Sequence, residues 1–369
     1  MEQVINPSRL KLARCRRQMT IKDLASKVGL TPRMVSEYEK DRCKSTPPES
    51  TLQAFSDALK YPISFLTYPE DMPEVSTDSV SFRSLKSMRA SERDAAIGAG
   101  ELGLVINRYF ESMFELENSS LPDFSCFEPE LAAELLRKEW GLGTNSISHM
   151  IGLLEKHGVR VFSLDELTHS VDAFSFWKEG TSCVFLNTKK SGERSRFDAA
   201  HELGHLVLHR NAIPQGRDIE READRFAAEF LMPRETLLPY VGKFLSLNDI
   251  IRLKTNWKVS AMALIFSLKN AGVITEWQYR NLVIEASQKG LRTREIQGIP
   301  HESSKLIPQM LSRLEKMGIS LKQLSQSLLL PLEEIRGLLF QLEIFDGGNS
   351  SDVRQQVKPA LSLAWSRPE

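Results

Sequence analysis

The 369-residue chain lacks the features of an exported or membrane protein. Its first ten residues are polar, with no apolar segment of the kind found in a signal peptide. Nowhere does it contain the roughly 18 consecutive apolar residues that a membrane span needs. Its four cysteines, at positions 15, 43, 126 and 183, are scattered without paired spacing, which argues against a disulfide framework and a cysteine zinc finger. We therefore expect a cytoplasmic protein that does not bind a membrane.

The chain also has no excess of charge of one sign, because 48 basic residues balance 48 acidic ones. Any affinity for nucleic acid must then come from a local patch and not from the field of the whole molecule. Such a patch lies near the N-terminus, where the segment 9–27 has seven basic residues and one acid, Asp23. The basic residues are Arg9, Lys11, Arg14, Arg16, Arg17, Lys22 and Lys27.

Residues 7–66 have the turn chemistry of a run of short helices. Thr20 can cap a helix that ends before Gly29, and Thr31 followed by Pro32 can start the next one. This helix, turn and helix resembles the xenobiotic-response-element (Cro/repressor-like) helix-turn-helix family, with a scaffold helix from Thr20 and a recognition helix over 32–39.

The resemblance implies that this unit binds double-stranded DNA through the start of the recognition helix. It implies DNA-facing positions at Thr31, Arg33, Met34, Ser36 and Glu37, and phosphate contacts from Arg17 and Lys22. The family often has glutamine where this chain has Lys22, so backbone contact is expected there and not base recognition. Paired half-sites would make the protein a homodimer. The alternative is a helical interaction module that no longer binds DNA.

The segment 201–205, His-Glu-Leu-Gly-His, has the spacing of a metal site on a helix. Residues i and i+4 lie on one face, so His201 and His205 can direct two imidazole nitrogens at one ion, with Glu202 beside it. The apolar residues around the segment indicate a buried helix, which suits a dry metal site. The alternative is a chance occurrence of the pentapeptide.

A catalytic zinc site needs a third protein ligand, for which three downstream residues are candidates. His209 lies two turns, roughly 12 Å, from His201, too far to share one ion on an unbroken helix. A second helix over 218–232 has Glu220 and Glu222 near its start. Glu222 flanks the apolar face of that helix next to Ala223, whereas Glu220 lies further round toward solvent, so Glu222 is the predicted ligand.

The segments 196–209 and 222–233 resemble the ImmA/IrrE family of metallopeptidases, over roughly residues 150 to 270. They read RFDAAHELGHLVLH and EADRFAAEFLMP. The resemblance implies zinc held by His201, His205 and Glu222, with Glu202 as the catalytic general base. It also implies a regulator that cleaves a repressor, a toxin, another partner protein or itself in a stress or mobile-element response. The alternative is a non-catalytic DNA-binding repressor or antitoxin that uses the peptidase fold as a sensor or protein-binding domain.

The remaining pattern predicts a mainly α fold with a small β-sheet (α+β). The expected order is a five-helix DNA-binding domain (1–67), a linker (68–89), a zincin-like peptidase domain (90–270), a helical C-terminal region (271–346) and a flexible tail (347–369). Within the C-terminal region, residues 318–335 weakly resemble the N-terminal helix-turn-helix. Either a second DNA-binding unit or an ordinary amphipathic hairpin explains this pattern.

Overall fold

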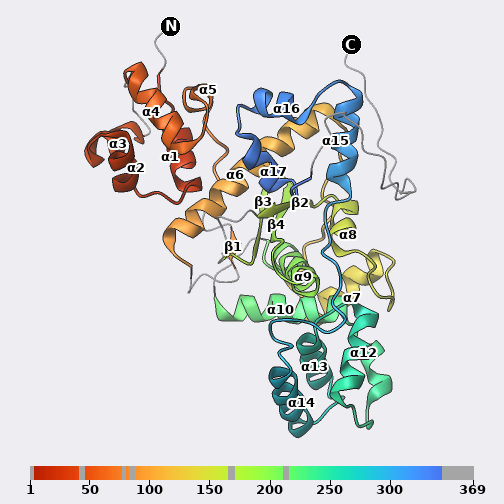
Figure 1. Ribbon diagram of the computed structural model, residues 1–369. Coiled ribbons are helices and arrows are strands. Elements are labelled where there is room, and N and C mark those ends of the chain that lie inside the picture. The colour runs from red at the N-terminus through yellow and green to blue at the C-terminus, as the bar shows by residue number, and fades with distance from the viewer. Residues whose placement is uncertain are drawn as a thin grey trace, which may run out of the picture.

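The computed structural model of the chain describes residues 4–40, 46–76, 80–82, 88–164, 171–210 and 216–342. Cys43 and the predicted tail 347–369 lie outside these residues. The described part is a set of helices around one small sheet (Figure 1), which confirms the predicted mainly α fold with a small β-sheet. No helix in this part is long and apolar enough to cross a bilayer.

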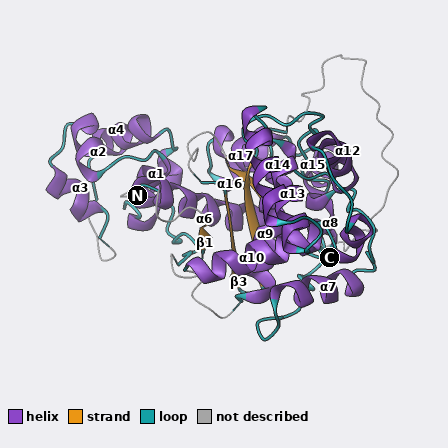
Figure 2. Cartoon of the chain, turned by 90° about the horizontal axis from the view of Figure 1, so that it is seen from below, coloured by secondary structure: helices purple, strands orange, loops and turns teal. Residues whose placement is uncertain are grey.

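The first five helices form a lobe at one side of the molecule (Figures 1 and 2). Thr20 and Asp23 close a capping box at the start of the second helix, Gly29 ends that helix in the left-handed conformation at φ 69°, and Thr31 caps the third. The predicted helix-turn-helix therefore forms through the predicted turn residues. The helices are α1 (Pro7–Arg16), α2 (Ile21–Val28), α3 (Pro32–Tyr38), α4 (Glu49–Leu59) and α5 (Ile63–Leu66).

A four-stranded sheet with the order β1-β3-β4-β2 lies at the centre of the molecule. Its middle strands form an antiparallel hairpin that turns at Gly180, β2 is parallel to β4, and β1 is antiparallel to β3 at the outer edge. The bounds are β1 (Ser81–Phe82), β2 (Arg160–Leu164), β3 (Ala173–Lys178) and β4 (Thr181–Asn187).

Residues of the sheet alternate between two buried faces, as the period of two in a strand requires. One face is aromatic and packs on α6 (Ala90–Met113), where Gly100 and Gly103 leave room for the rings. The other face is aliphatic and packs on α9 (Gly192–Leu208), the helix that contains the His-Glu-x-x-His segment. The aromatic face includes Phe162, Phe174, Phe176 and Phe185, and the aliphatic face Val161, Ala173, Val184 and Leu186.

The remaining helices of the central region share the buried cluster of α9, and Figure 1 shows α10 and α12–α14 below that helix. Among them α10 crosses directly under α9. The bounds are α7 (Pro129–Glu139), α8 (Met150–Lys156), α10 (Arg217–Leu231), α11 (Arg234–Leu237), the 3-10 turn η3 (Leu238–Tyr240), α12 (Leu247–Trp257), α13 (Ala261–Asn270) and α14 (Glu276–Gln288).

The last three helices repeat the geometry of α1–α3 with an offset of 300 residues. Ser320 caps its helix with a capping box as Thr20 does, and Leu329 is left-handed at φ 57° where Gly29 is. The amide of Leu330 bonds the carbonyl of Ser325 at 3.1 Å, as Leu30 bonds Ala25 at 3.0 Å. The helices are α15 (Leu306–Lys316), α16 (Leu321–Leu328) and α17 (Leu332–Leu338).

In this second unit the helix equivalent to α3 faces inward. Glu334 of α17 is buried and bonds Arg16 and Arg17 of α1, and the carbonyl of Gly337 accepts a bond from Ser163 of β2 at 2.6 Å. The unit therefore joins the N-terminal lobe to the sheet, and its inward face is covered by protein.

The two hydrophobic clusters do not follow the boundaries expected from the sequence. One is continuous from α1–α5 through α6 and the aromatic sheet face to α15–α17, and the other contains α7 to α14. Ser81 and Phe82, inside the expected linker, form β1 of the sheet. The packing thus joins segments that lie far apart in sequence. The predicted domain boundaries stay a prediction.

Candidate metal centre and DNA-binding surface

The His-Glu-x-x-His segment lies in the buried second half of α9. His201 and Glu202 have no exposed surface, and His205 is 4% exposed. At Gly204, α9 and α10 approach so closely that an added Cβ would lie 3.0 Å from the ring of Phe226 and 3.3 Å from the Cα of Ala223. A glycine here lets α10 approach α9 at the level of the two histidines.

Three side chains from these two helices converge on one point. The Nε2 atoms of His201 and His205 lie 3.0 Å apart. The carboxylate of Glu220 on α10 places its oxygens 3.4 Å from Nε2 of His201 and 3.5 Å from Nε2 of His205. All three groups offer a ligand atom within 4.8 Å of the others.

This arrangement fits a divalent metal ion. Two imidazoles and one carboxylate are a known ligand set of catalytic zinc, and ligands at about 2.0–2.1 Å in a tetrahedron lie roughly 3.3 Å apart. The separations of 3.0, 3.4 and 3.5 Å agree with that spacing. The cluster can therefore hold zinc through His201, His205 and Glu220.

Glu222, predicted from the sequence as the third ligand, lies outside this cluster. Its carboxylate bonds Nε2 of His209 at 2.9 Å, and its side chain is 44% exposed against 24% for Glu220. The geometry corrects the prediction to Glu220. The apolar stripe of α10 marks its buried face, but it does not say which flank of that face turns toward the histidines.

The Nδ1 atoms of His201 and His205, which face away from the cluster, also have hydrogen-bond partners. Asp224, four residues after Glu220 on α10, bonds Nδ1 of His201 at 2.9 Å. Nδ1 of His209 lies 3.0 Å from Nδ1 of His205, and Nε2 of His209 bonds Glu222 in turn. Such partners fix the ring orientation of metal-binding histidines. Asp224 was not predicted, although its position four residues after Glu220 places both on the same face of α10.

Glu202 contacts strand β3 of the sheet. Its Oε2 accepts a 2.6 Å bond from the hydroxyl of Ser175 on β3, and its buried Oε1 has no hydrogen-bond partner among the described residues. Burial raises the pKa of Glu202 to about 8, against the lowering effects of His201 and the Ser175 hydroxyl. A nearby cation would favour the ionised form. Ser175 was not predicted, because its contact depends on the pairing of sheet and helix.

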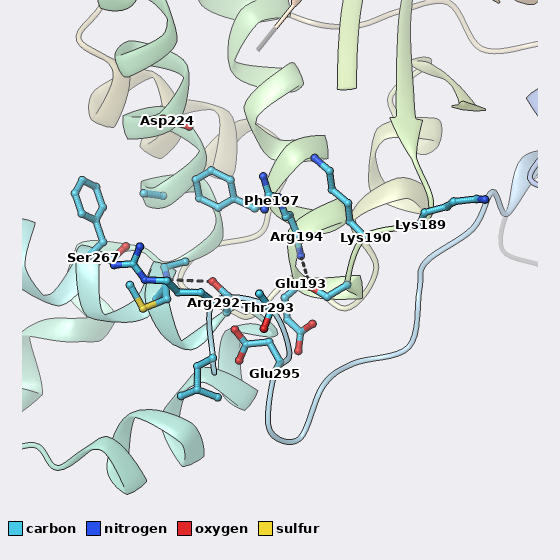
Figure 3. Close-up of a pocket in the computed structure, with 17 residues that line it drawn as sticks. Lys189, Lys190, Glu193, Arg194, Phe197, Asp224, Ser267, Arg292, Thr293 and Glu295 are labelled. Carbon is cyan, nitrogen blue, oxygen red and sulfur yellow. Dashed lines mark hydrogen bonds between the residues drawn. The ribbon is translucent and has the colours of Figure 1, made fainter. Parts of the chain in front are cut away.

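A cavity of about 760 Å³ has Asp224, the partner of His201, in its lining (Figure 3). It is bounded by the start of α9, by α13 and by residues 291–295. Phe197, Met262 and Phe266 give it an apolar wall, and the hydroxyl of Ser267 has no bonding partner there. Its basic lining residues are Lys189, Lys190, Arg194 and Arg292.

Most of the residues predicted from the sequence to face DNA are exposed on the N-terminal lobe. Thr31, Arg33, Met34 and Glu37 are exposed around the start of α3, and Ser36 is half-buried. Lys22 is exposed on α2.

Arg17 differs from its prediction as a phosphate contact. Its guanidinium bonds Glu334 at 2.7 Å and the carbonyl of Leu59 at 2.8 Å, so it joins the lobe to α17.

Comparison with known families agrees with both parts of this description. Residues 10–66 match a helix-turn-helix family model, and residues 154–269 match the IrrE N-terminal-like domain, a peptidase-family model. No curated protein sequence matches the chain. The chain is thus a fusion of an XRE-type helix-turn-helix domain with an IrrE-like metallopeptidase-type domain.

Proposed function

We propose that the protein is a DNA-binding regulator whose metallopeptidase-type domain hydrolyses a peptide bond in a partner protein or in its own chain. The convergence of His201, His205 and Glu220 supports this most directly. The resemblance to the ImmA/IrrE family is the basis for a stress or mobile-element response as the setting.

In this proposal His201, His205 and Glu220 hold zinc, and Asp224 and His209 keep the two imidazoles oriented. When bound, zinc supplies the Lewis-acid chemistry that makes water a nucleophile near neutral pH. Glu202 takes the proton of the attacking water on its unpartnered Oε1 and passes it to the leaving amine. The Ser175 hydroxyl holds the other carboxylate oxygen during this exchange.

The same proposal assigns the exposed start of α3 to DNA. Arg33, Met34, Ser36 and Glu37 face the bases, while Thr31 and Lys22 meet the phosphate backbone. A homodimer on paired half-sites would present two such helices.

The test is Glu202→Gln in the full chain. We expect the variant to retain one zinc per chain and to lose casein hydrolysis by at least about 100-fold, the size of a general-base contribution. Zinc content is measured by mass spectrometry of the metal, and hydrolysis by release of labelled peptides. Asp218→Asn, an exposed position at the start of α10, is the control that should leave both unchanged.

Loss of zinc together with activity would instead make Glu202 a structural residue. A wild-type protein that binds zinc but hydrolyses neither casein nor its own chain would favour the non-catalytic alternative, a DNA-binding protein that uses the peptidase fold as a sensor.

A further inference from the structure

Strand β1 comes from the segment that joins the DNA-binding lobe to α6. It pairs antiparallel with β3, with Ser81 opposite Ser175 and Phe82 opposite Phe174. Val80, just before it, is fully buried and anchors the segment in the core. Because the sheet order is β1-β3-β4-β2, this short strand covers the edge that β3 would otherwise present.

The covered edge is the one that holds Glu202. Ser175 donates to the Glu202 carboxylate at 2.6 Å, and Trp177, two residues along β3, donates through Nε1 to the carbonyl of Leu206 on α9 at 3.0 Å. The register therefore places the backbone of position 81 next to the residue that positions the proposed general base.

An extended backbone added to a sheet edge is a general way to bind a polypeptide, because the main-chain bonds do not depend on its sequence. Here the bound backbone belongs to the chain itself. We propose that residues 80–82 occupy this edge of β3 as a peptide substrate in cis, and that the metal site cuts the chain within them.

This proposal rests on the proposed function, since it uses the same metal ligands and Glu202. The reaction adds one water across one amide bond: the carbonyl carbon gains the hydroxyl, the amide nitrogen gains the proton, and nothing is oxidised or reduced. The cut breaks the main chain between the DNA-binding lobe and the rest of the protein.

The two products stay together after the cut. The lobe is held by the continuous hydrophobic cluster that α1 shares with α6, and by the buried bonds of Arg16 and Arg17 to Glu334. The nick is therefore invisible in native sizing and shows only after denaturation.

The experiment uses the full zinc-loaded chain, incubated and then analysed by mass spectrometry under denaturing conditions. We expect two fragments that meet within residues 80–82, formed at a rate independent of protein concentration. Glu202→Gln abolishes the cut. S81P/F82P, which removes the donors of β1, abolishes it as well but still hydrolyses casein. The control E74A/S76A, two exposed positions of the same segment, is cut like the wild type.

Hydrogen exchange without metal checks the pairing independently of activity. In the Glu202→Gln chain the β3 amides that face β1 are protected, and adding S81P/F82P exposes them, while the β3 amides that face β4 and those of α9 stay protected. A wild-type chain that hydrolyses casein but stays intact, or is cut elsewhere, overturns the proposal and leaves the proposed function standing. Unprotected β3 amides or a rate that rises with concentration also overturn it. A zinc-loaded wild-type chain that neither hydrolyses casein nor cuts itself removes the proposed function, and this proposal with it.

Discussion

Glu101, in the middle of α6, is a partly buried carboxylate where the N-terminal lobe, the joining segment and the sheet meet. Its Oε1 accepts one long bond, 3.5 Å, from the amide of Val75. Burial raises the pKa of Glu101 to about 7, against smaller opposing effects from that amide and from Lys11. The folded chain therefore binds more protons here than the unfolded chain between about pH 4.5 and pH 7. Stability must fall as pH rises through this window.

Replacing Glu101 with glutamine removes this titration and keeps the acceptor for Val75. We expect the wild type to lose about 2 kcal/mol more unfolding free energy than Glu101→Gln between pH 5 and pH 8. Urea unfolding at both values measures the difference, and the exposed Glu115→Gln is the control. An identical pH dependence in Glu101→Gln and wild type would contradict this account.

The choice between Glu220 and Glu222 shows how far the sequence predicts the metal ligands. The spacing of His201 and His205 specifies their relative position completely, because both lie on one helix. The third ligand lies on another helix, and its choice depends on how α10 is rotated against α9 at Gly204. No pattern within α10 contains that rotation, so the sequence favoured Glu222 where the structure brings in Glu220.

At the scale of elements, the docking of α17 on α1 depends on one buried carboxylate with two arginines. Glu334 and Arg16 are each 1% exposed and 2.7 Å apart. Although burial opposes it, these arginines hold the pKa of Glu334 below its ordinary value. Removing one member of such a group leaves a buried charge uncompensated.

We expect Glu334→Gln to reduce the unfolding free energy of the unit that contains α1 and α17 by about 3 kcal/mol. The reduction should appear as faster hydrogen exchange in both helices, while α12–α14 are unchanged. Glu333→Gln, one position away and exposed, is the control and should change neither. Equal exchange in both variants would show that apolar packing alone holds the lobe.

Elements were predictable where their signals are local. The cap Thr20 and the left-handed Gly29 marked α2, and the cap Thr31 marked the start of α3. The repeat over 306–342 gave only a weak pattern, because left-handed Leu329 replaces the turn glycine. Strand β1 was missed because its two residues pair with a strand more than 90 residues away.

At the scale of the whole molecule, the start of α3, which we propose faces DNA, and the metal cluster lie on different parts of the structure (Figures 1 and 2). DNA binding should therefore respond to changes in the lobe alone. On a duplex selected by the protein from a random pool, Arg33→Ala should weaken binding by about 1–3 kcal/mol. Lys22→Ala should weaken all duplexes alike and lower the salt slope by about 1.

Band shifts at several salt concentrations measure both effects. Lys289→Ala, at the C-terminal cap of the distant α14, is the control. Unchanged affinity and slope in both lobe variants would place the DNA contacts elsewhere.

A zinc-anomalous diffraction map of zinc-loaded crystals tests most directly whether His201, His205 and Glu220 bind the metal. We predict one peak at about 2.0–2.2 Å from Nε2 of His201, Nε2 of His205 and a Glu220 oxygen, with Asp224 on the far side of the His201 ring. A peak bound by Glu222 or His209, or no peak between the two histidines, would contradict it.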